Sequence, residues 1–170
     1  MALKKVLLMG NPRLIEPSKP IEDFSHPQLP TILKDMQDTM HAKGGVGIAA
    51  PQIGYFLRLI LFGFENSKRY PSAPNIPLTV LANPGFTPIG TETEDDWEGC
   101  LSVPGLRGLV TRYKRIQFTA HDMHGNQISG EAEGFKARVI QHECDHLDGI
   151  LYPRRIRDLR YFGFEDQLQY

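Results

Sequence analysis

The chain of 170 residues has few cysteines, almost no net charge and no long hydrophobic run. Two cysteines, Cys100 and Cys144, are too few for a disulfide-rich secreted scaffold, so we expect a reduced, cytoplasmic protein. A formal net charge of −1 gives no electrostatic reason to expect binding to nucleic acid or membranes. No apolar run reaches the length of a membrane span, and the N-terminus resembles no signal peptide.

The remaining composition is that of an ordinary globular protein. Hydrophobic residues make up 41% and charged residues 23%, which predicts a single domain over residues 1–170 with its own core. Prolines cluster at 65–78, which we interpret as a surface loop. A tail from about residue 153 carries several arginines, a pattern typical of a solvated face.

One stretch carries metal-binding chemistry, namely Gln141-His142-Glu143-Cys144-Asp145-His146. The periodicity predicts a helix over 135–148, on which His142 and His146 share the apolar face. Histidines at this spacing can bind one metal ion, and Glu143 beside them can act as general base on bound water. An ordinary helix with two satisfied histidines is the alternative, because this short pattern also arises by chance.

A catalytic metal site needs a third protein ligand. Tyr152 stands where a metzincin would carry its third histidine, and Glu165, near the end of the tail, is the sole downstream glutamate. Cys100 is the upstream candidate, because one cysteine and two histidines leave a fourth position for water. Plain packing remains an alternative for Cys100, and it is our interpretation of Cys144, which lies away from the histidines on the helix.

The rest of the chain alternates between strand-like and turn-like segments after one amphipathic helix between residues 27 and 43. The small residues of 45–52 predict either a helix-to-strand turn or a substrate-lining loop in which Gln52 offers an amide donor. Buried or alternating patterns predict strands at 57–62, 79–82, 86–92, 109–113, 116–120 and 128–133.

Three segments in this order resemble the signature motifs of the peptide deformylase family. They are Gly45-Val46-Gly47-Ile48-Ala49-Ala50-Pro51-Gln52, Glu98-Gly99-Cys100-Leu101-Ser102 and the histidine stretch at 141–146. The resemblance implies an α+β fold, with mainly antiparallel sheets packed around a central metal-binding helix and with an N-terminal amphipathic helix. It implies a metal-dependent hydrolase that removes the formyl group from N-formylmethionine of newly made polypeptides and releases formate.

The resemblance also implies a role for each matching residue. Fe²⁺ is the favoured metal, and Zn²⁺, Ni²⁺ or Co²⁺ can occupy the same ligands. The implied metal ligands are Cys100, His142 and His146; the acid/base is Glu143; the oxyanion donors are Gln52 and the Leu101 backbone N–H; and the substrate-contacting residues are Gly47, Phe135 and Val139.

The implied partners are an N-formylmethionyl peptide and, transiently, the ribosome. Two features depart from the commonest form of the family, namely the Pro-rich stretch at 65–78 and a tail ending in Phe162-Gly163-Phe164. Two other functions remain alternatives. A general metallopeptidase would use the same helix without needing Cys100, and a non-catalytic peptide-binding module would keep the fold without turnover.

Overall fold

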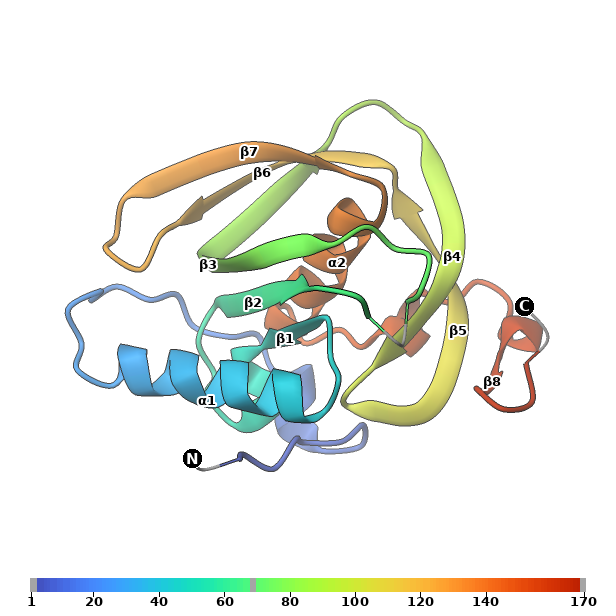
Figure 1. Ribbon diagram of the computed structural model, residues 1–170, viewed down its shortest axis with the longest axis horizontal. Helices are drawn as coiled ribbons and strands as arrows, with labels where there is room; N and C mark the ends of the chain where they lie inside the picture. Colours follow the sequence, from blue (N-terminus) through green and yellow to red (C-terminus); the bar gives the residue numbers. More distant parts are fainter. Residues whose placement is uncertain (1–2, 68–69, 169–170) are drawn as a thin grey trace.

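Two antiparallel sheets and two α-helices make up residues 3–67 and 70–168, which the computed structural model describes (Figure 1). One sheet has the strand order β1-β2-β3-β6-β7 and the other has the order β4-β5-β8. The strands are β1 Gly47–Ala49, β2 Leu59–Phe64, β3 Ile76–Pro88, β4 Thr93–Cys100, β5 Val103–Tyr113, β6 Arg115–His121, β7 Gln127–Glu133 and β8 Phe162–Phe164. The predicted α+β class with antiparallel sheets is confirmed. The chain ends and residues 68–69 of the predicted loop lie outside the described residues.

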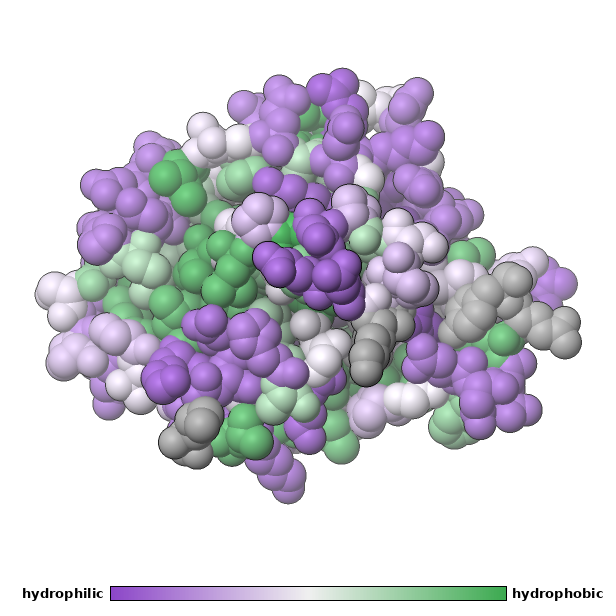
Figure 2. All heavy atoms as spheres, viewed as in Figure 1, coloured by the Kyte–Doolittle hydropathy of each residue, from purple (hydrophilic) through white to green (hydrophobic). Residues whose placement is uncertain are grey.

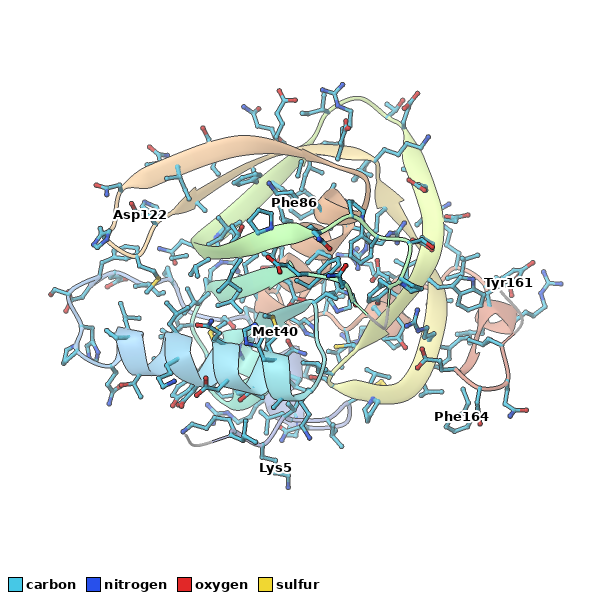
Figure 3. All side chains as sticks on the ribbon, in the orientation of Figure 1. Lys5, Met40, Phe86, Asp122, Tyr161 and Phe164 are labelled. Atoms are coloured by element: carbon cyan, nitrogen blue, oxygen red, sulfur yellow. The ribbon has the colours of Figure 1, made fainter. Side chains whose placement is uncertain are left out.

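The first helix, α1, spans Leu29–Ala42, inside the predicted range of 27–43. Its apolar residues recur at intervals of three and four, so that Met36 and Met40 are fully buried against β1 and β2 (Figure 3). The helix ends before Gly44, whose positive φ of 62° lets the chain turn into β1.

The second helix, α2, spans Gly134–Leu147, one residue earlier at each end than the predicted 135–148. It follows β7 directly, and Gly149 stops it with a φ of 71°. The helix contacts strands of both sheets, including β1, β2 and β5 (Figure 1). Most of its side chains are therefore buried, including polar ones.

The strands predicted at 79–82 and 86–92 are wrong as two separate elements. Residues 76–88 form one strand, β3, and residues 89–92 belong to no strand. The pairing of β3 with β6 shifts register between Ala82 and Gly85. Asn83 adopts a positive φ of 49°, and its side chain pairs with the backbone N and O of Ile21 at 2.8 and 2.9 Å. These bonds hold a bend in the strand, so the Asn-Pro-Gly sequence does not terminate it.

The sequence pattern did not predict β4, because half of its eight residues are acidic and disfavour strands. The strand forms through its antiparallel pairing with β5, which starts earlier than predicted and spans 103–113. The tail adds β8 to the other edge of β5, with Leu106 opposite Phe164. The three-stranded sheet therefore forms through pairing between strands rather than through local sequence preference. Its first strand, β4, ends at Cys100.

The largest group of buried apolar side chains lies between the five-stranded sheet and α2, and Cys144 is part of it. A second group lies between that sheet and α1. In the view of Figure 2, hydrophobic side chains also gather on the surface above α1, while polar residues surround them. Among the described residues, neither α-helix combines the length and the apolar character that crossing a membrane requires.

Candidate metal centre

The two histidines of α2 lie side by side on the face that points toward β4. Their ring centroids are 5.1 Å apart, as expected for positions separated by one helical turn. His146 is only 2% exposed, so water has little access to its ring. Helix α2 therefore presents two imidazoles in a buried setting.

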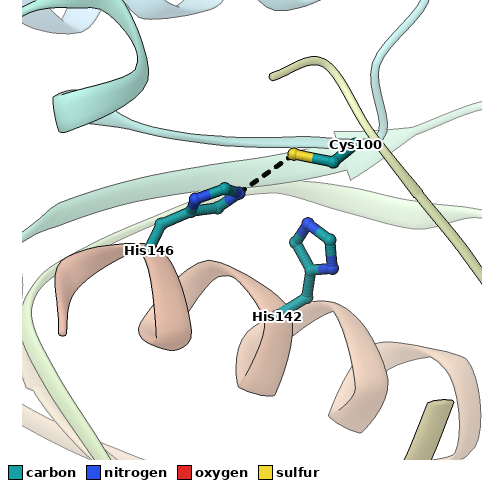
Figure 4. Close-up of side chains that lie close together, drawn as sticks. All are labelled: Cys100, His142 and His146. Carbon is teal, nitrogen blue, oxygen red and sulfur yellow. Dashed lines mark hydrogen bonds between the residues drawn. The ribbon is translucent and has the colours of Figure 1, made fainter. Parts of the chain in front are cut away.

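Cys100, at the end of β4 in the three-stranded sheet, lies close to these histidines (Figure 4). Its Sγ lies 3.2 Å from Nε2 of His146. The ligand atoms of Cys100, His142 and His146 all lie within 4.8 Å of one another. The pairing of β4 with β5 shifts register at Gly99 and Cys100, and this irregularity marks the point where the strand turns toward the helix.

The cysteine is prepared to act as a thiolate. Burial alone would raise the pKa of the Cys100 thiol, but the charge of His146 and a hydrogen bond with His142 outweigh burial and hold the pKa well below its usual range. The thiolate is the form that binds metals. One thiolate and two imidazoles are a donor set that suits zinc and iron alike.

Glu98 orients the first histidine. Its Oε2 lies 2.8 Å from Nδ1 of His142. The other ring nitrogen, Nε2, is therefore left free to bind a metal ion together with Cys100 and His146. Burial would raise the pKa of the Glu98 carboxyl, but the His142 hydrogen bond and the charge of Arg112 outweigh burial and lower the pKa. Glu98 is therefore ionised and accepts the Nδ1–H of His142.

A buried ionic network holds Glu98 in turn. Arg112 donates to both of its carboxylate oxygens at 2.9 and 3.0 Å, and Arg138 donates to Oε1 at 2.9 Å. Arg112 also donates to Asp145 of α2 at 2.6 Å, and Asp145 accepts from Arg155 at 2.7 Å. These charges are paired and hydrogen-bonded, as buried charges must be. The network connects β4 and β5 of the three-stranded sheet with α2 and the tail.

Glu143 lines the same cavity as Cys100 and His142, two of the three candidate ligands. It is 4% exposed, and its Oε2 has no hydrogen-bond partner among the described residues. Burial raises the pKa of Glu143 to about 7. A carboxylate in this state can take up and release a proton near neutral pH.

Gly47 and Gln52 approach this cavity from β1 and the short helical turn that follows it. A Cβ atom on Gly47 would overlap the carboxylate of Glu143, so any larger residue there would displace that carboxylate. The amide of Gln52 is oriented by Ala49, whose backbone N donates to its Oε1 at 2.8 Å. Its Nε2 therefore points toward Cys100, at 3.4 Å from Sγ.

The remaining predicted site residues lie at the rim of the same cavity. Leu101, in the turn after Cys100, is half-buried, and Phe135 and Val139 line the cavity from the first turns of α2. Eight of the nine residues predicted for the site therefore line one cavity. The ninth, His146, adjoins it through its Nε2, which lies 3.2 Å from Cys100 Sγ. Cys144 is free and buried within the apolar core, in agreement with its interpretation as packing.

Sequence reasoning missed three residues that line the cavity, namely Tyr70, Glu98 and Arg138, and it missed Arg112, which holds Glu98. Glu98 carried a signal, because histidine ligands commonly donate their second N–H to a carboxylate. The arginines carried none, because their partners are distant in sequence. Tyr70 belongs to the Pro-rich loop, where no periodicity indicates which side chain turns inward.

The donor set fits a metal ion, because the three ligand atoms converge and Glu143 Oε2, which has no hydrogen-bond partner among the described residues, belongs to the helix that carries the histidines. Polypeptide deformylase is the family whose sequence model matches residues 3–161. Peptide deformylase 1 of Nitrosomonas europaea is 54% identical over 166 residues, or 98% of this chain and 94% of that protein. Peptide deformylase 1 of Bordetella pertussis is 55% identical over 163 residues, or 96% and 93% of the two chains.

Solved structures agree with the sequence relatives. The class I type b peptide deformylase from Acinetobacter baumannii, with Met-Ala-Ser bound, superposes with a TM-score of 0.87 at 34% identity, covering 91% of this chain and 99% of that chain. The peptide deformylase from Thermotoga maritima gives a TM-score of 0.81 at 34% identity, covering 93% of this chain and all of that one. The architecture described above is thus shared across these enzymes.

Proposed function

Because this chain belongs to the polypeptide deformylase family, we propose which of its residues carry out the reaction of that family. The enzyme removes the N-formyl group from newly synthesised polypeptides. We assign Cys100, His142 and His146 as the metal ligands on helix α2 and strand β4. The support is the 3.2 Å separation of Cys100 Sγ and His146 Nε2, with His142 held beside them by Glu98.

A divalent ion bound by these three side chains would acidify a water molecule and polarise the formyl carbonyl. Glu143 takes the proton from that water as the new C–O bond forms. It then gives the proton to the amine nitrogen as the C–N bond breaks, and the products are formate and a peptide with a free N-terminus. A pKa near 7 suits both directions of transfer.

Gln52 and Leu101 stabilise the negative charge that develops on the formyl oxygen. The Nε2 of Gln52 already points toward Cys100, and Leu101 follows Cys100 in the chain, where its backbone N–H can serve as the second donor. Removing one such donor typically lowers the rate about 10²–10³-fold. The Gln52 amide is held by Ala49 N, Cys100 Sγ and Ser102 Oγ before substrate binds, and such preorganisation is what this kind of stabilisation requires.

The substrate presents an N-formylmethionine. Phe135 and Val139 line an apolar wall for its side chain, while Gly47 leaves room for the substrate backbone beside Glu143. A relative was solved with Met-Ala-Ser bound, a peptide of the product type. We assign the same class of substrate to this chain.

We assign Fe²⁺ as the native metal, with Zn²⁺, Ni²⁺ and Co²⁺ as ions that the same ligands accept. The whole chain, residues 1–170, then serves as one catalytic domain arranged around α2, with α1 as its N-terminal amphipathic helix. The free cysteines suit a reducing cytoplasm, where the enzyme meets its substrate during transient contact with the ribosome.

One experiment tests the assignment of roles. Enzyme purified and assayed without oxygen, with Fe²⁺ supplied, should release formate from formyl-Met-Ala-Ser. Glu143→Gln should keep one metal per chain and lose about 10²–10⁴-fold in turnover, because it removes a general base and spares the ligands. Unchanged turnover in Glu143→Gln would contradict the assigned base.

A further inference from the structure

Tyr70, from the loop between β2 and β3, lines the metal cavity. Its ring centroid is 4.8 Å from that of Phe135, which lines the cavity. Phe64, at the end of β2, contacts the same Phe135 ring edge-on at 5.8 Å. The end of β2 and the loop that follows it therefore each supply one aromatic contact to Phe135, a residue of the proposed methionine wall.

Two further contacts fix the Tyr70 side chain, and an ion pair holds one of its partners. Its hydroxyl oxygen accepts a hydrogen bond from the backbone N of Gly99 at 3.3 Å, next to Cys100. The guanidinium of Arg107 lies over its ring at 4.9 Å. Arg107 is in turn paired with Glu165, which follows β8, at 2.8 Å. The loop side chain is thus positioned by β4, β5 and the tail together.

Tyr70 also separates two cavities. It borders the metal cavity on one side, and on the other side it borders a neighbouring cavity lined by Trp97, Arg107 and Glu165. Phe135 and Arg138 are the other residues shared by both cavities. The guanidinium of Arg138 is engaged by the carbonyls of Glu94 and Val110 at 2.7 and 2.8 Å. Of the three residues that separate the two cavities, Phe135 and Arg138 belong to α2 and Tyr70 belongs to a loop.

We propose that Tyr70 is a specificity-determining residue, whose ring forms the outer wall of the pocket for the first side chain of the substrate. This inference rests on the proposed function, because it takes the methionine side chain to lie against Phe135. Removing the ring would join the two cavities, so a bulkier first side chain would fit. The effect should appear in substrate binding, because Tyr70 is not among the residues assigned to ligation, proton transfer or oxyanion binding.

The alternative is that Tyr70 only anchors the loop through its hydroxyl group. Two variants separate these roles, because Tyr70→Phe keeps the ring and removes the bond from Gly99, whereas Tyr70→Ala removes both. Tyr161→Ala is a matched control, since Tyr161 is 47% exposed at the outer end of the tail (Figure 3). Tyr70→Leu is a second test if Tyr70→Ala fails to fold.

The experiment measures kcat and KM for formyl-Met-Ala-Ser and formyl-Phe-Ala-Ser with the Fe²⁺ enzyme. Tyr70→Ala should raise KM for the methionine substrate about tenfold and lower its kcat/KM preference over phenylalanine by a similar factor. Tyr70→Leu should shift the same ratio in the same direction, while Tyr70→Phe and Tyr161→Ala should keep the wild-type ratio. Metal content should be unchanged in all four variants.

Two results would overturn the inference. An unchanged methionine preference in folded, active Tyr70→Ala or Tyr70→Leu would show that the ring is no wall of the pocket. An equal loss of preference in Tyr70→Phe would assign the effect to the hydroxyl group and to loop anchoring. Absence of formate release by the wild-type enzyme would instead overturn the proposed function, and this inference with it.

Discussion

The carboxylate of Glu98 lies 2.8 Å from Nδ1 of His142 and joins a proposed metal ligand to a buried pair of arginines. Glu98 and His142 are 44 residues apart in sequence and belong to different elements, β4 and α2. It fixes which nitrogen of His142 faces Cys100. The position of the ring thus depends on ionic contacts that lie outside the ligand set.

Glu98→Gln should weaken metal binding about 10–100-fold, the usual effect of losing such a carboxylate partner. It should also lower stability, because Arg112 and Arg138 would lose a buried countercharge. Competition with a chelator measures the first effect, and chemical denaturation of the metal-free protein measures the second. Glu131→Gln, at an exposed surface pair with Arg115, is the control and should change neither quantity appreciably.

Gly47→Ala should lower turnover about 10²-fold, because its Cβ would displace the Glu143 carboxylate from its position beside the cavity. Overpacking of this kind also costs about 1–3 kcal/mol of stability. Gly85→Ala is the matched control in a strand, since the nearest atom to its Cβ is 3.9 Å away. Formate release and thermal unfolding of both variants check the prediction, and equal turnover in the two variants would contradict it.

The two cysteines should differ in reactivity once metal is removed. Burial raises the pKa of the Cys144 thiol to about 12, so at pH 8 only about 10⁻⁴ of it is thiolate. The pKa of Cys100 is shifted the other way, and its side chain lines the cavity. Chelated, folded protein should therefore be alkylated by iodoacetamide at Cys100, and mass spectrometry of the peptides locates the label.

Raising the pH should extend labelling to Cys144 only as its pKa is approached, because a raised pKa keeps the thiol protonated over most of the alkaline range. Denatured protein provides the reference, where both thiols should react at pH 8. Faster labelling of Cys144 than of Cys100 in folded protein would contradict the account.

The sequence predicted both helices well, because their apolar residues recur at helical intervals and glycines follow their ends. It also predicted the residues around the cavity, because their chemistry and order resemble family motifs. It failed for β4, whose acidic residues disfavour strands and whose pairing with β5 is tertiary. It divided β3 at Asn83, since Ile21, whose backbone N–H and C=O hold the bend through the Asn83 side chain, is 62 residues away in sequence.

The sequence also showed no sign of the ion pairs between distant elements. Arg112 and Arg138 read as ordinary cations in the sequence, but each is buried against a carboxylate contributed by another element. Tyr70 reads as one aromatic residue in a Pro-rich loop, and its packing against Phe135 exists only after β2, β3 and α2 have assembled. Contacts of this kind depend on topology, which local pattern does not encode.

Cobalt substitution tests the proposed ligand set most directly, because a thiolate bound to Co²⁺ gives a charge-transfer absorption that imidazoles alone do not. The wild-type protein and Cys144→Ser should each bind one Co²⁺ per chain and show this band, whereas Cys100→Ser should lose it. Retention of the band in Cys100→Ser, or its loss in Cys144→Ser alone, would contradict a metal held by Cys100, His142 and His146.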